Sequence, residues 1–248
     1  MTHRIIGIIP ARMESTRFPG KPLAPILGIP MIEHVYRRVS MCQSLESVYV
    51  ATCNEEIRQC TADFGGNAIM TSTRHQRASD RVAEAAQNIE ADIVVMIQGD
   101  EPMTVPEMID LAIEPMLDDD SVKCVNLSKR IESEEEFLSP NTIKVSIDRE
   151  GNALYFSREP IPTRHILGFG NSSVFKQVCI IPFRNDMLET YAALEQTPLE
   201  KAESVDMLRL MENGYKVRMV NVNHNTHAVD TPEDLNFVAS LMRDDPLI

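Results

Sequence analysis

The chain has 248 residues, of which 43% are hydrophobic and 25% are charged, and its formal net charge is -13. This length and composition are typical of one globular domain, or of one domain that carries an additional lobe. The acidic balance argues against a nucleic acid as the main partner, because proteins that follow a phosphate backbone have basic surfaces.

The cysteine pattern and the lack of long apolar runs bear on the compartment. The five cysteines, at positions 42, 53, 60, 124 and 179, form no CxxC pair and no zinc-finger spacing. Such a scattered set is typical of reduced thiols. The apolar run at residues 5–9 is too short for a signal-peptide core or a membrane span, and no other run approaches eighteen residues. We therefore expect a cytoplasmic protein with no membrane partner.

The first hundred residues alternate between apolar strands and amphipathic helices. The residue pattern predicts strands at 4–10, 48–52, 67–70 and 93–97. It predicts helices at 31–39, at 55–60 with Asn54 as the N-cap, and at 81–89 with Ser79 or Asp80 as the cap. The strand at 93–97 is apolar on both faces, as a central parallel strand is. This alternation predicts right-handed βαβ units and a parallel sheet.

The second half of the chain has a mixed pattern. We expect a helix at 106–117, an acidic turn at 118–120, β segments at 122–128, 143–147, 153–156 and 174–183, a short helix from 133 and a loop or arm at 163–173. Helices at 185–194 and 202–211, a strand at 216–222 and a closing helix at 232–242 complete the chain. The prediction is an α/β fold in one domain, residues 1–248. Its core comprises about 1–130 and 200–248, and a smaller inserted α+β lobe comprises about 131–199.

The loop after the first strand concentrates positive charge in an acidic chain. Arg12, Arg17 and Lys21 lie within ten residues, together with Ser15 and the turn Pro19-Gly20. A buried strand that leads into a cationic loop of small residues is how an α/β sheet forms an anion site at its carboxyl edge. Three fixed cations suit a triphosphate better than a single carboxylate. The alternative is a solvated basic loop.

Two aspartates are candidate ligands for a metal ion. Asp100 follows the central strand directly, after Gln98 and Gly99, at the position where groups line the ligand crevice of an open α/β sheet. A hard cation such as Mg²⁺ needs only one or two carboxylates. Asp230 would supply the second carboxylate, although an aspartate before Thr231 and Pro232 is also ordinary chemistry for the start of a helix.

A polar segment at residues 71–81 lies between a predicted strand and a predicted helix. Its side chains and amides could recognise the edge of a nucleobase, with His75 as one candidate. The alternative is that His75 is a surface histidine.

Five motifs, in order along the chain, resemble the 3-deoxy-manno-octulosonate (Kdo) cytidylyltransferases, or CMP-Kdo synthetases. They are Ile-Ile-Pro-Ala-Arg-Met-Glu-Ser-Thr-Arg-Phe-Pro-Gly-Lys-Pro-Leu from Ile8, Gly-Ile-Pro-Met-Ile from Gly28, Gln-Gly-Asp-Glu-Pro from Gln98, Ala-Leu-Tyr-Phe-Ser-Arg from Ala153 with Pro160-Ile161-Pro162, and Val-Asp-Thr-Pro-Glu-Asp from Val229. The first motif is fairly specific to sugar cytidylyltransferases, and the set is highly so. The sequence has neither a Walker A lysine loop nor a GxGxxG motif.

The resemblance implies a Rossmann-like nucleotidyltransferase fold and a Mg²⁺-dependent transfer of CMP from CTP to an acidic sugar, for lipopolysaccharide biosynthesis. It implies Arg12, Lys21 and Asp100 as catalytic residues, and Asp100 and Asp230 as Mg²⁺ ligands. The implied CTP-binding residues are Ala11, Arg12, Ser15, Arg17, Lys21, Arg74, His75, Ala78, Ser79 and Gln98. The implied acceptor-binding residues are Arg158, Gln177, Glu203 and Asp206. By the same analogy the chain forms a homodimer through its smaller lobe.

The chain departs from the family pattern mainly at positions assigned to the acceptor. The family has a strand of the type His-x-Gly-Ile-Tyr-x-Tyr, whereas this chain has Gln-Val-Cys-Ile-Ile-Pro-Phe from Gln177 to Phe183. Met207 stands where the family has a glutamine. In the base pocket, Ser-Gly-Thr has become Arg77-Ala78-Ser79. Polar groups left without partners in a site cost about 1–3 kcal/mol each, so lost donors weaken recognition of a polyol.

Three functions therefore stay open on the sequence. The first is CMP transfer to Kdo or a Kdo-like 2-keto acid. The second is the same transfer to another acid, such as 8-amino-Kdo, another keto-acid sugar or a phosphonate. The third is a CTP-binding paralogue without catalysis, which the intact pair of Asp100 and Asp230 argues against.

Overall fold

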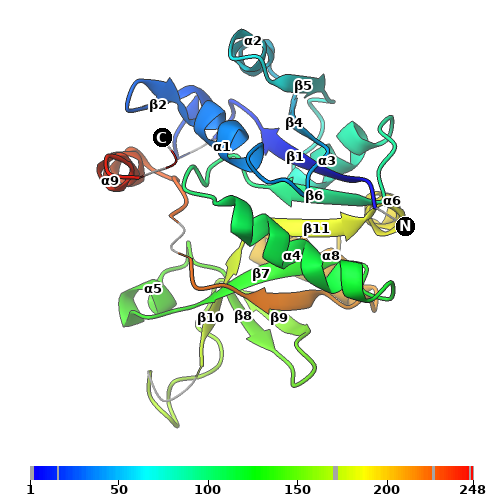
Figure 1. Cartoon of the computed structure of the whole chain (residues 1–248). Helices are drawn as coiled ribbons and strands as arrows, with labels where there is room; N and C mark the ends of the chain where they lie inside the picture. Colours follow the sequence, from blue (N-terminus) through cyan, green and yellow to red (C-terminus); the bar gives the residue numbers. More distant parts are fainter. Residues whose placement is uncertain (1–2, 16, 170–172, 225–226, 246, 248) are drawn as a thin grey trace. The chain divides into compact units, whose positions relative to one another are not determined.

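The computed structural model describes residues 3–15, 17–169, 173–224, 227–245 and 247 (Figure 1). The chain divides into two compact units. The first unit comprises Met1–Asp110 and Asn225–Ile248, and the second comprises Leu111–His224. From the sequence we expected the core to extend to about residue 130 and to resume at about residue 200. The division by contacts lies elsewhere because the strand at Arg218–Asn221 pairs with the strand at Val125–Arg130 inside the second unit.

The first unit contains parallel strands in the order β6, β1, β4, β5 (Figure 1). These are β1 (Ile5–Ala11), β4 (Ser47–Thr52), β5 (Asn67–Met70) and β6 (Ile93–Ile97). Every residue of β1 and β6 is buried, which explains their continuous apolar sequence. The predicted parallel sheet of the first hundred residues is confirmed.

Helices connect these strands. They are α1 (Met31–Val39), α2 (Glu55–Asp63) and α3 (Ala78–Ala86), and α4 (Pro106–Asp118) follows β6. A short 3₁₀ turn (Lys21–Leu23) and a hairpin of β2 (Pro25–Ile26) and β3 (Ile29–Pro30) precede α1. The closing helix α9 (Pro232–Met242) has the predicted bounds, and its Val238 and Met242 pack in a core cluster with Ile26, Met31 and Val229.

Helix α3 begins three residues earlier than we expected. Ser79 and Asp80, which looked like helix caps, lie inside its first turn, and Arg77 occupies the N-cap position. Ser79 is fully buried, and its hydroxyl approaches Met96 Sδ at 3.7 Å. The cap prediction was wrong because burial of this small side chain against β6 outweighs its local capping preference.

The second unit contains a mixed sheet in the order β12, β7, β10, β8, β9 (Figure 1). These are β7 (Val125–Arg130), β8 (Lys144–Ile147), β9 (Ala153–Ser157), β10 (Phe175–Val178) and β12 (Arg218–Asn221). β12 pairs with β7 in parallel, and the other pairs are antiparallel. The unit also contains α5 (Glu134–Leu138), β11 (Ile180–Arg184), α6 (Asn185–Ala193), α7 (Pro198–Glu203) and α8 (Met207–Glu212).

Two predicted elements of this unit are interrupted. The β segment at 174–183 is two strands, β10 and β11, and Cys179 lies between them. The helix at 202–211 is also two helices, because Ser204 adopts the left-handed conformation, with φ of 55°. The predicted loop at 163–173 lies partly outside the described residues, at 170–172.

Among the residues that the structure describes, no helix combines the length and the apolar character that a membrane-crossing segment needs.

Candidate functional site

The loop between β1 and Lys21 is shaped by backbone hydrogen bonds. The Gly20 N–H donates to the Met13 carbonyl at 3.0 Å, which closes the loop immediately before Lys21. Gly20 has a φ of +74°, a conformation that side chains with a Cβ rarely adopt. The Phe18 N–H donates to Ser15 Oγ at 3.2 Å. The loop therefore returns its lysine to the carboxyl edge of the sheet.

Asp100 and Asp230 come from distant parts of the sequence to the same edge. Gly99 lets β6 end against β1, because a Cβ at this position would lie 3.0 Å from the Pro10 carbonyl oxygen. The Val229 N–H donates to the Asp100 carbonyl at 2.8 Å. This bond joins Asp100 itself to the residue that precedes Asp230.

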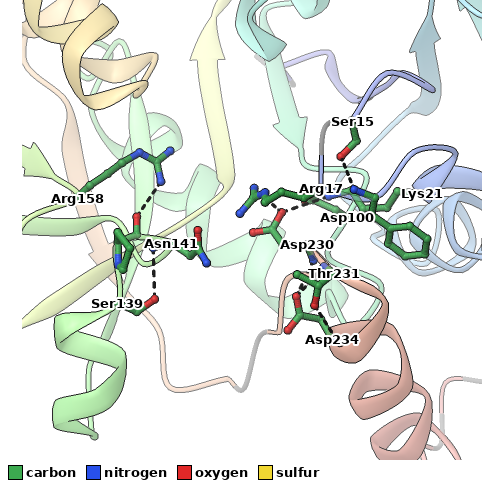
Figure 2. Close-up of polar contacts among 12 residues, drawn as sticks. Ser15, Arg17, Lys21, Asp100, Ser139, Asn141, Arg158, Asp230, Thr231 and Asp234 are labelled. Atoms are coloured by element: carbon green, nitrogen blue, oxygen red, sulfur yellow. Dashed lines mark hydrogen bonds and ion pairs between the residues drawn. The ribbon is translucent and has the colours of Figure 1, made fainter.

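The two carboxylates converge on one ammonium group (Figure 2). Lys21 Nζ lies 2.7 Å from Asp100 Oδ2 and 3.4 Å from Asp230 Oδ1. Arg17 Nη2 also contacts Asp230 Oδ1, at 2.9 Å. Lys21 is only 13% exposed, whereas Arg17 is 49% exposed. Two cations thus balance two anions, and screening by solvent is weaker at Lys21.

The start of α9 does not use Asp230 as its cap. Thr231 Oγ1 accepts a hydrogen bond from the Asp234 N–H at 3.2 Å, and Asp234 Oδ2 accepts from the Thr231 N–H at 2.8 Å (Figure 2). This capping box satisfies the helix terminus. The Asp230 carboxylate is consequently available to Lys21 and Arg17, so the ordinary helix-start interpretation applies to Thr231 instead.

A cavity of about 850 Å³ opens at this edge of the first unit. Most of the predicted nucleotide and metal residues line it: Ala11, Arg12, Ser15, Arg17, Lys21, His75, Ala78, Gln98, Asp100 and Asp230. Arg74 and Ser79 do not belong to its lining. The backbone N–H and Nε of Arg74 contact Ser72 Oγ, and Ser79 is buried beside Met96. The volume is in the range of pockets that hold small ligands.

The segment that carries His75 is held by two residues of α3. Glu84 Oε2 accepts the Ser72 N–H at 2.9 Å and also contacts His75 Nε2. Arg81 Nη1 donates to Thr71 Oγ1 at 2.5 Å. Burial alone would raise the pKa of Glu84. The hydrogen bonds from Ser72 and His75 and the nearby positive charges together have the larger, opposite effect, so the pKa lies below its ordinary value.

Several residues of this site were not predicted. Glu14, Arg77 and Arg81 line the cavity, and Glu84 holds His75 from behind. The sequence signal for Arg77 was its departure from the family pattern, which we noted without a role. Glu84 carried no signal, because an acidic residue on a helix is most often simply solvated.

In the second unit, Glu203 and Arg158 are bound to each other. The Glu203 carboxylate accepts hydrogen bonds from Tyr155 Oη at 3.1 Å, Ser157 Oγ at 3.0 Å and the Arg158 N–H at 2.7 Å. Arg158 Nε donates to the Glu203 carbonyl at 2.7 Å, and Nη1 donates to the Pro140 carbonyl at 3.0 Å. Glu203 therefore holds Arg158 in position.

Lys144 binds backbone carbonyls at and near Arg158. It is fully buried, and its Nζ donates to the carbonyls of Ser139 at 2.9 Å, Thr142 at 2.7 Å and Arg158. Burial lowers the pKa of Lys144. Ser139 Oγ also accepts the Asn141 N–H at 3.3 Å (Figure 2). One buried cation thus ties the Arg158 carbonyl to the segment at Ser139 and Thr142.

The other two predicted acceptor residues have different surroundings. Gln177 Nε2 donates to Asn126 Oδ1 at 2.6 Å, in a network centred on β7 and β10. Asp206 occupies the N-cap position of α8, and its side chain makes no capping hydrogen bond there. The described contacts therefore join Arg158 to Glu203, and they do not join either residue to Gln177.

The family departures at 181, 183 and 207 fall on buried apolar positions. Ile181, Phe183 and Met207 are 2% exposed or less. Phe183 packs on Tyr191 with ring centroids 6.2 Å apart, and Met207 Sδ lies 3.8 Å from Cys124 Sγ. The lost polar groups have been replaced by packing, which satisfies the fold and offers no donor to a polar acceptor.

Asp100 and Asp230 suit a metal ion that takes few protein ligands. No group of three or more His, Cys, Asp and Glu side chains suited to a metal occurs in the described parts of the chain. Two aspartates that share one ammonium are nevertheless a donor set that suits Mg²⁺, which keeps several waters and binds phosphate oxygens alongside one or two carboxylates.

Comparisons with known proteins identify the family of this chain. A family described as cytidylyltransferase matches residues 6–227. A 3-deoxy-manno-octulosonate cytidylyltransferase of Geobacter metallireducens is 45% identical and covers 95% of this chain and 96% of the relative. One of Pelobacter propionicus is also 45% identical and covers 93% and 94%.

A solved structure supports the same assignment. The structure of a CMP:2-keto-3-deoxy-manno-octonic acid synthetase complexed with CTP is 40% identical, with a TM-score of 0.90, and covers 96% of this chain and 98% of that chain. The expected nucleotidyltransferase fold is confirmed by this likeness. The chain belongs to the 3-deoxy-manno-octulosonate cytidylyltransferase family.

Proposed function

We propose that this enzyme transfers CMP from CTP to Kdo, releasing pyrophosphate and forming CMP-Kdo. The observation that carries the proposal is the Lys21 ammonium held between Asp100 and Asp230 in a cavity that Arg12 and Arg17 also line. The relatives and the solved structure named above support CTP and Kdo as the substrates.

In the proposed reaction a hydroxyl of Kdo attacks the α-phosphorus of CTP, and the bond to the bridging oxygen of pyrophosphate breaks. Arg12, Arg17 and Lys21 supply fixed positive charge for the triphosphate and for the leaving group. Such preorganised charge is typically the largest contribution to catalysis of phosphoryl-type transfers. Gln98 and the segment at His75 would hold the cytidine.

We propose Asp100 and Asp230 as the residues that hold Mg²⁺. When bound there, the ion would neutralise phosphate charge and orient the reacting oxygens. The same two carboxylates also contact Lys21 Nζ, at 2.7 Å and 3.4 Å, which keeps them close together.

The acceptor is tested directly by measuring pyrophosphate release with CTP, Mg²⁺ and a panel of acids, and identifying the CMP product by mass spectrometry. The panel contains Kdo, 8-amino-Kdo, a second keto-acid sugar and a phosphonate. Turnover with Kdo is expected. Preference for another panel member would overturn Kdo as the acceptor, and the apolar Ile181, Phe183 and Met207 are the feature that would explain it. Binding of CTP without turnover of any acid would favour a non-catalytic paralogue.

We also propose that the enzyme is a cytoplasmic homodimer. All five cysteines are free thiols, which is consistent with a reducing compartment. In the second unit, the edge strand β9 carries Leu154, which is 60% exposed, and Ile166 and Leu167 are 83% and 58% exposed. Exposed apolar side chains of this kind are typical of contact surfaces. Light scattering coupled to gel filtration would show a mass near 28 kDa if the dimer proposal is wrong.

A further inference from the structure

Asn54 is a helix-cap residue whose side chain does not cap its helix. It occupies the N-cap position of α2, where its carbonyl accepts the Arg58 N–H at 3.1 Å. Asparagine is among the best N-cap residues because its side-chain oxygen accepts an N–H of the first turn. The Asn54 side chain makes no such bond. The first turn of α2 consequently gives up an interaction that this residue type normally supplies.

The Asn54 side chain contacts the cationic loop instead. Its Oδ1 accepts the Met13 N–H at 3.0 Å, and its Nδ2 lies 3.4 Å from Glu14 Oε1. The Met13 amide is a donor and the Glu14 carboxylate is an acceptor, so both contacts require the same orientation of the Asn54 amide. The Asn54 N–H donates to Thr52 Oγ1 at 3.1 Å, and Thr52 is fully buried at the end of β4. The backbone of Asn54 is therefore anchored to the end of a buried strand, close to the loop that its side chain contacts.

Met13 transmits this placement to the charged residues on both sides. It directly follows Arg12, which lines the cavity. Its carbonyl accepts the Gly20 N–H at 3.0 Å, and Gly20 directly precedes Lys21. Asn54 thus holds Met13, and Met13 holds both ends of the loop: Arg12 directly precedes it, and Gly20, the residue before Lys21, is bound to its carbonyl. The parallel register of β1 and β4, with Ala11 opposite Thr52, brings the two segments to the same edge.

We propose that Asn54 is a positioning residue for the loop that carries Arg12 and Lys21, and that its side chain serves this loop at the expense of capping α2. The proposal rests on the proposed function in one respect, namely that this loop binds the phosphates of CTP. It assigns to Asn54 no contact with substrate. A shift of about 1 Å in a positioning group can reduce a rate by about two orders of magnitude, so the effect is measurable.

The decisive variant is Asn54→Ser. Serine is an equally good N-cap, but its hydroxyl is one bond too short to take the place of Oδ1 at Met13. We expect a melting temperature equal to or above that of the wild type. We also expect about a tenfold rise in the Kd for CTP and a similar fall in kcat/KM for CTP. Asn54→Asp keeps the acceptor for the Met13 N–H but replaces the donor to Glu14 with a like charge, so we expect its Kd for CTP to lie between those of the wild type and Asn54→Ser.

Ser133→Ala is the matched control. Ser133 caps α5 with its side chain, accepting the Glu136 N–H at 3.1 Å, and α5 lies in the second unit. Loss of this cap should lower the melting temperature and leave the Kd for CTP unchanged. The control and Asn54→Ser therefore have opposite signatures.

Calorimetry with CTP in the absence of acceptor keeps this inference separate from the proposed reaction. Wild-type CTP affinity and kcat/KM in Asn54→Ser would overturn the positioning role, even if Kdo turns over. A lower melting temperature with unchanged CTP affinity would also overturn it, because Asn54 would then serve only the fold. If the wild type binds CTP but turns over no acid, the proposed function fails and the comparison of affinities still tests Asn54.

Discussion

Replacing Asp100 with asparagine should separate catalysis from nucleotide binding. Lys21, Arg17, Asp100 and Asp230 form a set of two cations and two anions, so Asp100→Asn changes the local charge from zero to +1. A more positive cavity attracts CTP at least as well as before. The carboxylate pair proposed for Mg²⁺ is broken, however. We expect an unchanged or lower Kd for free CTP, a higher Mg²⁺ concentration for half-maximal rate, and a large loss in kcat.

The structure sets the magnitudes. Loss of one charge contact to the reacting groups typically costs about 10²–10³ in kcat. A unit charge 4 Å away contributes between about 1 kcal/mol in water and about 4 kcal/mol near a protein surface, which bounds the gain in CTP affinity. The fold should change little, because Lys21 keeps Asp230 at 3.4 Å and can still donate to the asparagine oxygen. A loss of about 1 kcal/mol would lower Tm by about 2–4 °C in a chain of this size.

The assay combines pyrophosphate release over a Mg²⁺ titration with calorimetry of CTP binding and thermal unfolding. Asp110→Asn is the control, because it makes the same charge change at a carboxylate that contacts Cys42 Sγ and Ser44 Oγ and is not part of the cavity lining. It should keep the wild-type kcat. An Asp100→Asn enzyme with wild-type kcat and wild-type Mg²⁺ dependence would refute the assignment of the metal site.

Three further predictions concern stability and thiol reactivity. Folding lowers the pKa of Glu84 from 4.5, so the ionised carboxylate stabilises the fold above this pH, and that stabilisation is lost as the pH falls through the folded pKa. The difference in Tm between Glu84→Gln and the wild type should therefore shrink in acid. A difference that grew in acid would contradict the direction of the pKa shift. Arg209 and Glu200 form a buried pair with contacts of 2.7 and 2.9 Å, so Arg209→Met alone should cost about 3–5 kcal/mol in urea unfolding. A second change, Glu200→Leu, should restore part of this loss and not all of it, because Glu200 also accepts the Thr197 N–H in the capping box of α7; a double variant no more stable than Arg209→Met would contradict the reasoning. Burial raises the pKa of Cys42 to about 11 and also raises that of Cys124, so a thiol reagent at pH 8 should label these two last among the five cysteines; early labelling of either would contradict their burial.

Elements with a strong local pattern were predictable from the sequence alone. Helix α1 and helix α9 have the bounds that apolar spacing and capping residues predicted. Strands β5 and β6 also have the predicted bounds. These elements are predictable because the period of the apolar residues and the capping residues both lie within about ten neighbouring residues of the chain.

Elements that depend on distant partners were predicted less well. The sequence predicted one β segment in place of β10 and β11, because the residue pattern at 174–183 does not show where the pairing with β7 and β8 ends. The break between α7 and α8 depends on the left-handed conformation of Ser204, a residue type that gives little warning of it. The start of α3 depends on the burial of Ser79 beside Met96.

The candidate site shows the same division. The sequence by itself determined the candidate residues: Arg12, Arg17, Lys21 and Asp100 by charge and by their places after predicted strands, and Asp230 through the resemblance to the cytidylyltransferases. Only the tertiary structure decided how their side chains are used. It placed the Asp230 carboxylate on Lys21 and Arg17 instead of on the helix, and it turned Asn54 away from its helix towards Met13. The physical reason is that a polar side chain can satisfy its hydrogen bonds locally or at a distance, and only the arrangement of the neighbouring segments decides which partner is within reach.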